Sequence, residues 1–221
     1  MGVGVVVAWL VGFAGTADCQ DVFFPPGSMR IEKTAGGRAR PDRTQEYWDG
    51  AAKFSRCQLA EELGLLGEAS MFRGEADSDF RVLVEGADGS LLVVRARGRE
   101  VAVKRHEPGR GTSVKESRAV LQEASARALS TLVSALRLAD TPGLRPSKAF
   151  GPGIVPVHPV SWLAEVRESG AYGYGWFEDP VAATNGGAEL IRAVRLIVSA
   201  AGPELLPKIS GEQVTTHPDG G

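Results

Sequence analysis

Three short apolar runs separated by glycine-containing turns constrain the fold of this chain more than any other feature. The runs are residues 80–84, 91–96 and 101–103. Gly86 and Gly89 lie in the first connection, and Gly98 lies in the second. Apolar side chains that alternate with others, in runs broken by tight glycine turns, are typical of antiparallel strands. The sequence therefore predicts an antiparallel meander.

A long helix is expected to follow the meander and to pack on its sheet. Ser113 fits a helix N-cap. Apolar residues recur after it every three or four positions, which lines one face of an α-helix. These residues are Leu121, Ala124, Ala128, Leu132, Ala135 and Ala139.

Two further helices are predicted, one before the meander and one near the C-terminus. The first begins at Asp42 as N-cap, with Gln45 at the capping-box position, and stops at Gly67. The second begins after Asn185 and ends before Gly202. Its expected buried side consists of Leu190, Val194, Ile197 and Ala201.

The length of 221 residues suits one core with a small appendage. Residues 18–41 are rich in proline and glycine and are expected to form a linker. Residues 42–202 are predicted to form a single α+β domain, and residues 203–221 a flexible tail. The expected architecture is an antiparallel sheet of three to five strands packed against a long helix, with a preceding helix and a C-terminal helix.

The stretch between the long helix and the C-terminal helix is expected to contain mixed structure. Residues 141–152 indicate a loop, and residues 153–157 a short strand. Ser161 fits the cap of a short helix. A second strand is predicted where aromatic residues alternate, either filling the core or stacking on a sugar or base. Its aromatic residues are Tyr172, Tyr174 and Trp176.

The formal net charge of −2 argues against general attraction to nucleic acid or to acidic membranes. Four basic residues, Arg81, Arg95, Arg97 and Lys104, nevertheless fall on the strand face opposite the apolar one. An anion or nucleic-acid surface is one interpretation of them. A solvated face is the favoured one, because exposed charge usually has no other role and acidic residues lie close by.

The N-terminal residues 1–17 fit either a cleaved secretory signal or a buried strand. Residues 3–14 are apolar, and Gly15-Thr16-Ala17 supplies the small residues of a cleavage site. The apolar run is shorter than the roughly 20 residues that a membrane-spanning helix needs, so no integral span is expected.

Cys19 and Cys57 are the only cysteines. In an exported chain they are expected to pair, and closing a loop of that length would stabilise the fold by about 3–4 kcal/mol. In a cytosolic chain they are expected to be two ordinary thiols. The sequence holds no cysteine and histidine cluster with the spacing of a zinc site.

Two motifs within the meander resemble parts of a known family. Gly86-x-x-Gly89-x-Leu91 is similar to the end of a kinase glycine-rich loop, and residues 97–104, RGREVAVK, are similar to its third strand. The resemblance is to the N-terminal lobe of bacterial eukaryotic-type Ser/Thr protein kinases and covers residues 79–190. It implies ATP as the ligand, held by Gly86, Gly89 and Lys104, with Lys104 paired to Glu123 on the following helix. Glu116 is the second candidate for that pairing.

The sequence departs from the kinase pattern at the positions that carry catalysis. Val84 replaces the first loop glycine, and only His217-x-Asp219 resembles a catalytic loop, with no asparagine or metal-binding aspartate after it. The resemblance therefore implies a catalytically incomplete, cytoplasmic lobe that acts as a binding or regulatory module. The alternative is an exported α+β domain with a Cys19–Cys57 disulfide, no enzyme activity and a protein as its partner.

Overall fold

The computed structural model describes residues 23–25, 28, 45–74, 78–86, 89–108, 113–145, 161–178 and 186–205. Within these residues, seven strands form one sheet in the order β4-β3-β2-β1-β6-β7-β5. Six of them are antiparallel: β1 (Ser78–Glu85), β2 (Leu91–Arg97), β3 (Glu100–His106), β4 (Val114–Val120), β6 (Ser161–Glu168) and β7 (Ala171–Glu178). The short β5 (Gly143–Arg145) pairs parallel to β7. The fold is therefore α+β, with more strands than predicted.

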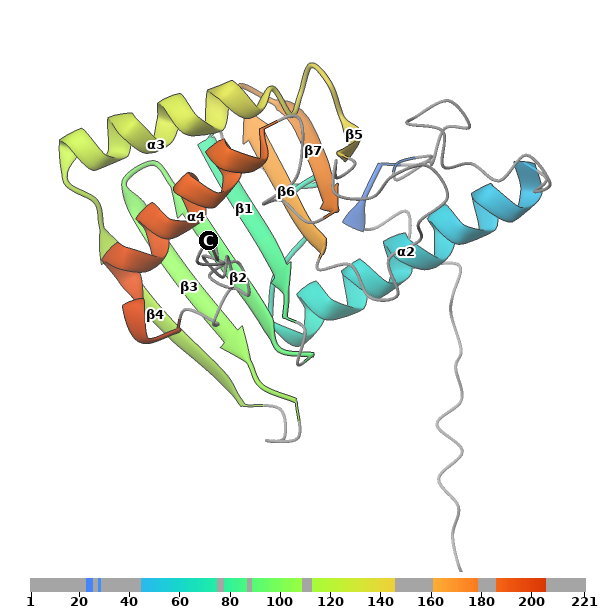
Figure 1. Ribbon diagram of the computed structural model, residues 1–221, viewed down its shortest axis with the longest axis horizontal. Helices are drawn as coiled ribbons and strands as arrows, with labels where there is room; N and C mark the ends of the chain where they lie inside the picture. The colour runs from blue at the N-terminus through green and yellow to red at the C-terminus, as the bar shows by residue number, and fades with distance from the viewer. Residues whose placement is uncertain are drawn as a thin grey trace, which may run out of the picture.

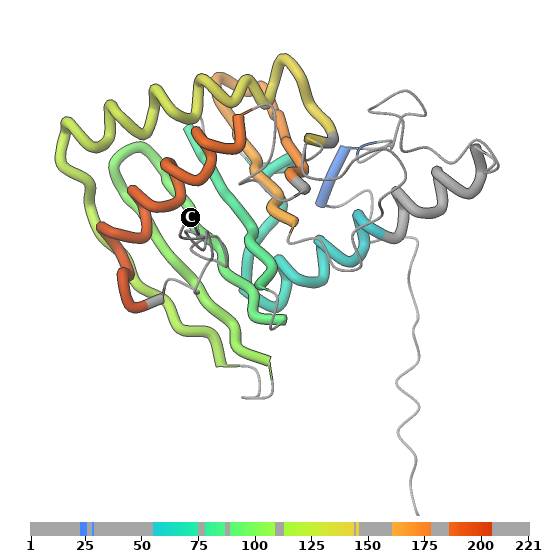
Figure 2. The backbone as a smooth tube through the Cα atoms, in the orientation of Figure 1, coloured from blue at the N-terminus to red at the C-terminus, as the bar shows by residue number. Residues whose placement is uncertain are grey.

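Helices cover both faces of the sheet. Three α-helices have described bounds, α2 (Gln45–Leu65), α3 (Glu123–Leu136) and α4 (Gly187–Ala201), and a 3-10 turn, η1 (Pro203–Leu205), follows α4. Helices α3 and α4 lie together on one face, and α2 lies on the other (Figure 1). Figure 2 traces the chain from the edge strand β4 directly into α3. These two faces are named here the α3–α4 face and the α2 face.

The main core lies under the α3–α4 face. Alternate residues of β1, β2 and β3 point into it, as the apolar pattern predicts, and Trp162 and Phe177 extend it across β6 and β7. The predicted stripe of α4 is confirmed, because each of its residues is buried. Full burial of a leucine, valine or isoleucine side chain in this stripe contributes about 1.5–3 kcal/mol. The stripe consists of Leu190, Val194, Ile197 and Ala201.

A smaller core lies under the α2 face. Leu59, Leu63 and Leu66 from the end of α2 pack on Leu83, Val93 and Leu163 of the sheet, together with Phe24. The predicted helix before the meander is thus confirmed over its described residues: α2 ends at Leu65, and the chain turns at Gly67, whose φ of +67° favours glycine. The predicted N-cap, Asp42, lies outside the described residues. No described helix combines the length and the apolar character that crossing a bilayer requires.

The helix predicted from Ser113 is wrong in its first part. Residues 114–120 form β4, and α3 begins only at Glu123, after Gln122 as N-cap. Ala124, Ala128 and Ala135, expected in the buried stripe, are exposed, whereas Leu129 and Leu136 are buried. The apolar pattern did not reveal β4, because little of this edge strand is buried on either of its faces. Such a strand does not need apolar residues at alternate positions.

The short helix predicted at Ser161 is also wrong, because these residues form β6. Trp162, Leu163 and Ala164 are consecutive and all buried. A strand covered on both faces needs apolar residues at successive positions, and that run cannot be distinguished from a helix by its period. The predicted strand with Tyr172, Tyr174 and Trp176 on one face is confirmed as β7.

Several predictions fall on other parts of the chain. The signal-like residues 1–17, the strand at 153–157, Asn185 and His217 lie outside the described residues, and so do the linker and the tail apart from a few positions. The domain limits predicted there stay predictions.

Candidate functional site

Two rows of mainly polar side chains cross the sheet on the α2 face. Strand register places the members of each row directly opposite one another on neighbouring strands. Alternation along a strand sends them all to one face. From β4 to β7, one row is Arg118, Ala102, Arg95, Arg81, Glu165 and Tyr174, and the other is Val120, Glu100, Arg97, Asp79, Arg167 and Tyr172.

Glu68 joins three of the basic side chains on this face. The chain turns at Gly67 where α2 ends, and the Glu68 N–H donates to the carbonyl of Leu63 at 2.9 Å. The Glu68 carboxylate is thereby directed under the sheet, where only 2% of its side chain is exposed. Its Oε1 lies 2.7 Å from Lys104 Nζ, and its Oε2 lies 3.2 Å from Arg95 Nη1 and 3.5 Å from Arg81 Nη1.

The centre of the rows is a fully buried ion pair. Arg81 and Glu165 are both 0% exposed, and Arg81 Nε and Nη2 donate to Glu165 Oε2 at 2.8 and 2.6 Å. Arg81 Nη1 also donates to the Ala69 carbonyl at 2.6 Å. The Tyr172 hydroxyl donates to Glu165 Oε1 at 2.9 Å, and burial together with the nearby Glu165 charge raises the pKa of Tyr172. These bonds satisfy the buried charges and attach the 66–74 segment to the sheet.

Asp79 holds the outer arginines. Arg95 Nε donates to Asp79 Oδ1 at 2.9 Å, and Arg95 Nη2 also bonds to Asp79 Oδ2. The hydrogen bond to Asp79 raises the pKa of Arg95. Arg97 Nη2 lies 3.2 Å from Asp79 Oδ2, but 56% of the Arg97 side chain is exposed. Arg97 therefore has donors left to offer a ligand.

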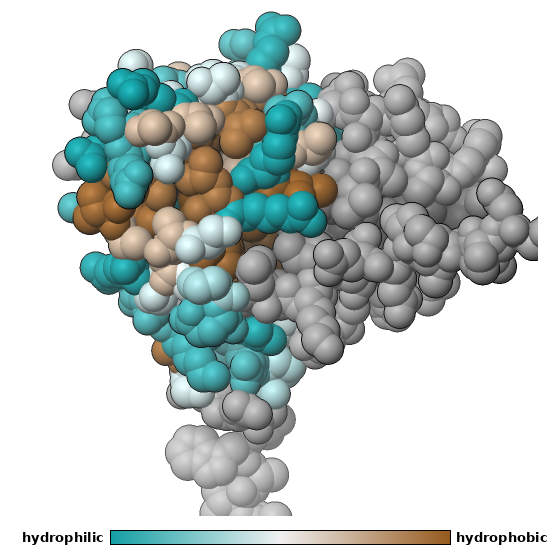
Figure 3. Space-filling model, turned by 60° about the vertical axis from the view of Figure 1, so that its left-hand side comes forward, coloured by the Kyte–Doolittle hydropathy of each residue, from teal (hydrophilic) through white to brown (hydrophobic). Residues whose placement is uncertain are grey.

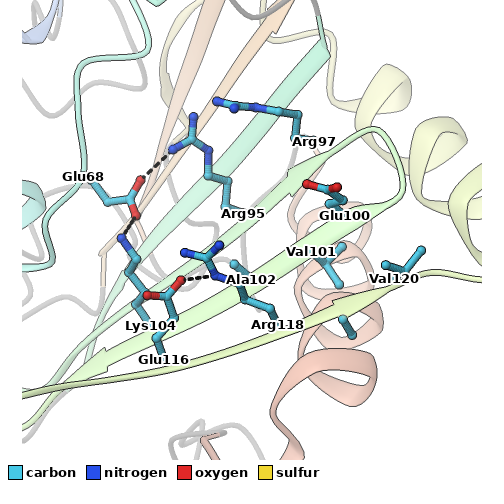
Figure 4. A pocket seen from close by; sticks show the side chains of 11 residues that line it. Glu68, Arg95, Arg97, Glu100, Val101, Ala102, Lys104, Glu116, Arg118 and Val120 are labelled. Atoms are coloured by element: carbon cyan, nitrogen blue, oxygen red, sulfur yellow. Dashed lines mark hydrogen bonds and ion pairs between the residues drawn. The ribbon is translucent and has the colours of Figure 1, made fainter.

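A groove of about 480 Å³ opens on the α2 face between Glu68 and the sheet edge. Figure 4 shows Glu68 between Lys104 and Arg95 on one side, and Glu116 bonded to Arg118 on the other. The short side chain of Ala102 lies between these two groups. The groove is lined by Glu68, Arg95, Arg97, Glu100, Val101, Ala102, Lys104, Glu116, Arg118, Ala119 and Val120.

The lining of the groove is mainly charged, with small apolar side chains between the charged groups. It includes four basic and three acidic side chains together with alanine and valine, but no hydroxyl, thiol or imidazole group. No group of three histidine, cysteine, aspartate or glutamate residues that could hold a metal occurs in the described part of the chain. Such a mixed lining matches a ligand that carries both charges and apolar groups.

The structure does not bring Lys104 and Glu123 together. Lys104 lies on the α2 face, where it pairs with Glu68 and donates to the Leu66 carbonyl at 3.2 Å. Glu123 opens α3 on the other face, where its carboxylate lies 3.5 Å from Arg127 and 3.9 Å from Arg99. The second candidate, Glu116, is directly opposite Lys104 in the register and lines the same groove, but its ion pair is with Arg118.

The glycines of the predicted nucleotide loop form the turn between β1 and β2. The Gly86 N–H donates to the Ser90 carbonyl at 2.7 Å, and the Gly89 N–H donates to the Gly86 carbonyl at 2.9 Å. Gly89 has a φ of +76°, a conformation that favours glycine. The turn therefore needs glycine at position 89 for its own geometry, and the nucleotide role of both glycines stays a prediction.

The favoured solvated basic face is wrong for three of its four residues. Arg81 is fully buried, and the side chains of Arg95 and Lys104 are 27% and 18% exposed. The prediction failed because Glu68, Asp79 and Glu165 were not identified as partners of the basic residues. Asp79 and Arg81 alternate within β1 and point to the α2 face, where an apolar core would otherwise be expected. This polar alternation is the sequence signal that indicates charge pairs on that face.

The predicted disulfide is tested only at one end. Cys57 lies on α2, is half-buried and is not a free thiol. Cys19 lies outside the described residues, so the Cys19–Cys57 pairing stays a prediction.

No protein-family model matches this chain, and no curated protein matches it significantly.

Proposed function

We propose that the chain is a binding module that receives an extended segment of a partner protein in the groove between Glu68 and β4. The groove itself carries this proposal, because its charged walls are already held in place by ion pairs with buried partners. Side chains fixed before binding lose little freedom when a ligand arrives, which favours affinity. Proteins that bind a partner commonly combine apolar contact with a charged, accessible rim.

The rim indicates the chemistry of the segment. Arg97 projects unused donors, and Val120 is 67% exposed at the far side of the groove. A segment that carries a carboxylate for Arg97 and an apolar side chain for Val120 would satisfy both. Glu100 and Glu116 would repel a strongly acidic chain, so nucleic acid fits the groove less well than a peptide of mixed charge.

Selection from a random peptide library displayed on phage tests the proposal. The expected peptides combine an acidic residue with an apolar one and bind the immobilised protein. Arg97→Gln removes one charged hydrogen-bond donor, which corresponds to roughly a tenfold or greater loss of affinity. Arg192→Gln is the matched control, because Arg192 is also an exposed, ion-paired arginine but lies on α4. Peptides that bind both variants equally, or a selection without enrichment, would contradict the proposal.

If the chain binds the nucleotide that the kinase resemblance implies, binding experiments should give a different result. Phosphate groups would have to compete with the Glu68 carboxylate for Lys104, whose nitrogen lies 2.7 Å away. A thermal shift with ATP and Mg²⁺ that Lys104→Ala abolishes, without any peptide binding, would favour the kinase-like module instead.

A further inference from the structure

Strand β4 presents an open edge of the sheet. Its seven residues pair with β3 without interruption, from Glu100 opposite Val120 to His106 opposite Val114. No other described strand lies on its outer side. The strand contains no proline and no bulge, two of the means by which a sheet edge is protected, but it carries a third, charged side chains, so a strand that pairs with it must match those charges. An edge of this length can accept another strand.

The ladder with β3 determines which backbone groups point outward. The Leu121 N–H donates to the Arg99 carbonyl at 2.8 Å, so these two residues form a hydrogen-bonded pair. Bonded and non-bonded pairs alternate in an antiparallel ladder. The odd-numbered residues of β4 therefore bond to β3, and the even-numbered ones project their N–H and C=O groups from the edge. The outward residues are Val114, Glu116, Arg118 and Val120.

These outward residues are complementary to themselves. If two copies of β4 run antiparallel about a twofold axis at Ser117, Glu116 lies opposite Arg118 of the second copy, and Val114 lies opposite Val120. All four pairs then join outward-facing residues, and opposite charges meet at both central positions. A shift by one outward residue along the strand would instead place Glu116 against Glu116, or Arg118 against Arg118. Directly opposed like charges destabilise strand pairing, so one register is favoured.

We infer that the chain forms a homodimer by antiparallel pairing of two β4 edges centred on Ser117. The pairing would join two seven-stranded sheets into one and place Val120, which is 67% exposed in the single chain, beside Val114 of the second copy. In the single chain, Glu116 Oε1 lies 2.6 Å from Nε of Arg118 on its own strand. Figure 3 brings forward the side of the molecule with β4 and the ends of α3 and α4, where hydrophobic and hydrophilic residues both reach the surface. A contact made mainly by one strand is small, so the dimer is expected to dissociate on dilution.

Sedimentation velocity over a wide concentration range tests the dimer. Glu116→Arg places arginine against arginine, and Arg118→Glu places glutamate against glutamate. Each single variant is expected to weaken self-association by roughly tenfold or more. Two combinations restore opposite charges: the double variant Glu116→Arg/Arg118→Glu, and an equimolar mixture of the two single variants. Recovery of the dimer in both supports the inference, because both residues are exposed and a loss of folding would not be repaired by mixing.

Cross-linking tests the register. Residues in a non-bonded pair have Cα atoms about 4.5 Å apart, close enough for a disulfide. Ser117→Cys is therefore expected to give a covalent dimer under an added oxidant, while Lys115→Cys, opposite Ala119 of the second copy, is not. The unaltered protein controls for the native cysteines. A wild-type protein that remains monomeric at every concentration would overturn the inference, and so would cross-linking through Lys115→Cys alone.

Discussion

Replacement of Arg81 by methionine is expected to be among the most destabilising substitutions on the α2 face. Arg81 donates to Glu165 twice and to the Ala69 carbonyl, and neither Arg81 nor Glu165 is exposed. Arg81→Met would leave the Glu165 carboxylate buried with the Tyr172 hydroxyl as its remaining donor. Breaking a buried ion pair in this way costs about 3–5 kcal/mol. That is a large part of the roughly 5–15 kcal/mol by which domains are stable.

Urea unfolding followed by circular dichroism measures this loss. With a slope of about 2 kcal/mol per molar urea, the midpoint is expected to fall by roughly 2 M at an unchanged slope. Arg192→Met is the matched control, because the Arg192–Glu189 pair is exposed and such pairs contribute about 0.2–1 kcal/mol.

The double variant Arg81→Met/Glu165→Leu distinguishes a lost charge partner from lost packing. Removing both charges leaves neither Arg81 nor Glu165 as a buried ion without its partner, so the double variant should be more stable than Arg81→Met alone. The Tyr172 hydroxyl then lacks its acceptor, which leaves a residual loss of about 1–3 kcal/mol. If the two single losses simply add, or if Arg81→Met costs less than about 1 kcal/mol, the buried pair does not organise this face as argued.

Three further predictions concern stability. Gly173→Ala should destabilise strongly, because a Cβ there would collide with the backbone nitrogen of Ala139. Gly64→Ala, at a helix position with nothing within 4 Å of the added Cβ, should instead stabilise the fold by about 0.5–1 kcal/mol, and thermal unfolding compares the two variants. Burial raises the pKa of Glu62, so its contribution to stability is present below its unfolded pKa of about 4.3 and is lost as the pH rises through the folded pKa. Glu62→Gln should therefore gain stability relative to wild type between pH 4 and pH 7 in paired urea titrations, and an unchanged difference would contradict this. The pKa of Tyr172 is also raised, so stability should fall as the pH rises above about 10, and Tyr172→Phe should lessen that alkaline loss.

The parts of the fold that the sequence predicted are those with one buried face and a marked end. Helix α4 has a single apolar stripe, and it ends where expected, before Gly202. The β1–β2 and β2–β3 turns need glycine at Gly89 and Gly98, which have φ values of +76° and +59°. In such segments the local pattern and the tertiary structure require the same residues, so the pattern is sufficient.

The candidate site could be predicted only in part, because its partners are far apart in the sequence. The basic residues of the α2 face were identified correctly as sharing one side of the sheet. Their acidic partners depend on how α2 returns across that face: Lys104 pairs with Glu68, not with Glu123, which begins a helix on the opposite side. Periodicity along one strand indicates the face of each side chain, but not which distant segment covers it.

The strand that the pattern missed is also the strand at which self-association is proposed, and both follow from its position. An edge strand has a neighbouring strand on one side only, and β4 is little covered on its two faces. It therefore needs no alternating apolar residues, and its sequence VKESRAV has none. The exposed charges of β4 discourage pairing with an arbitrary strand. A mismatched strand would place a like charge or an apolar group opposite Glu116 or Arg118. The same two charges favour a second copy, in which each meets its opposite. The charged residues that remove the alternating apolar pattern from β4 can thus also determine which strand pairs with it.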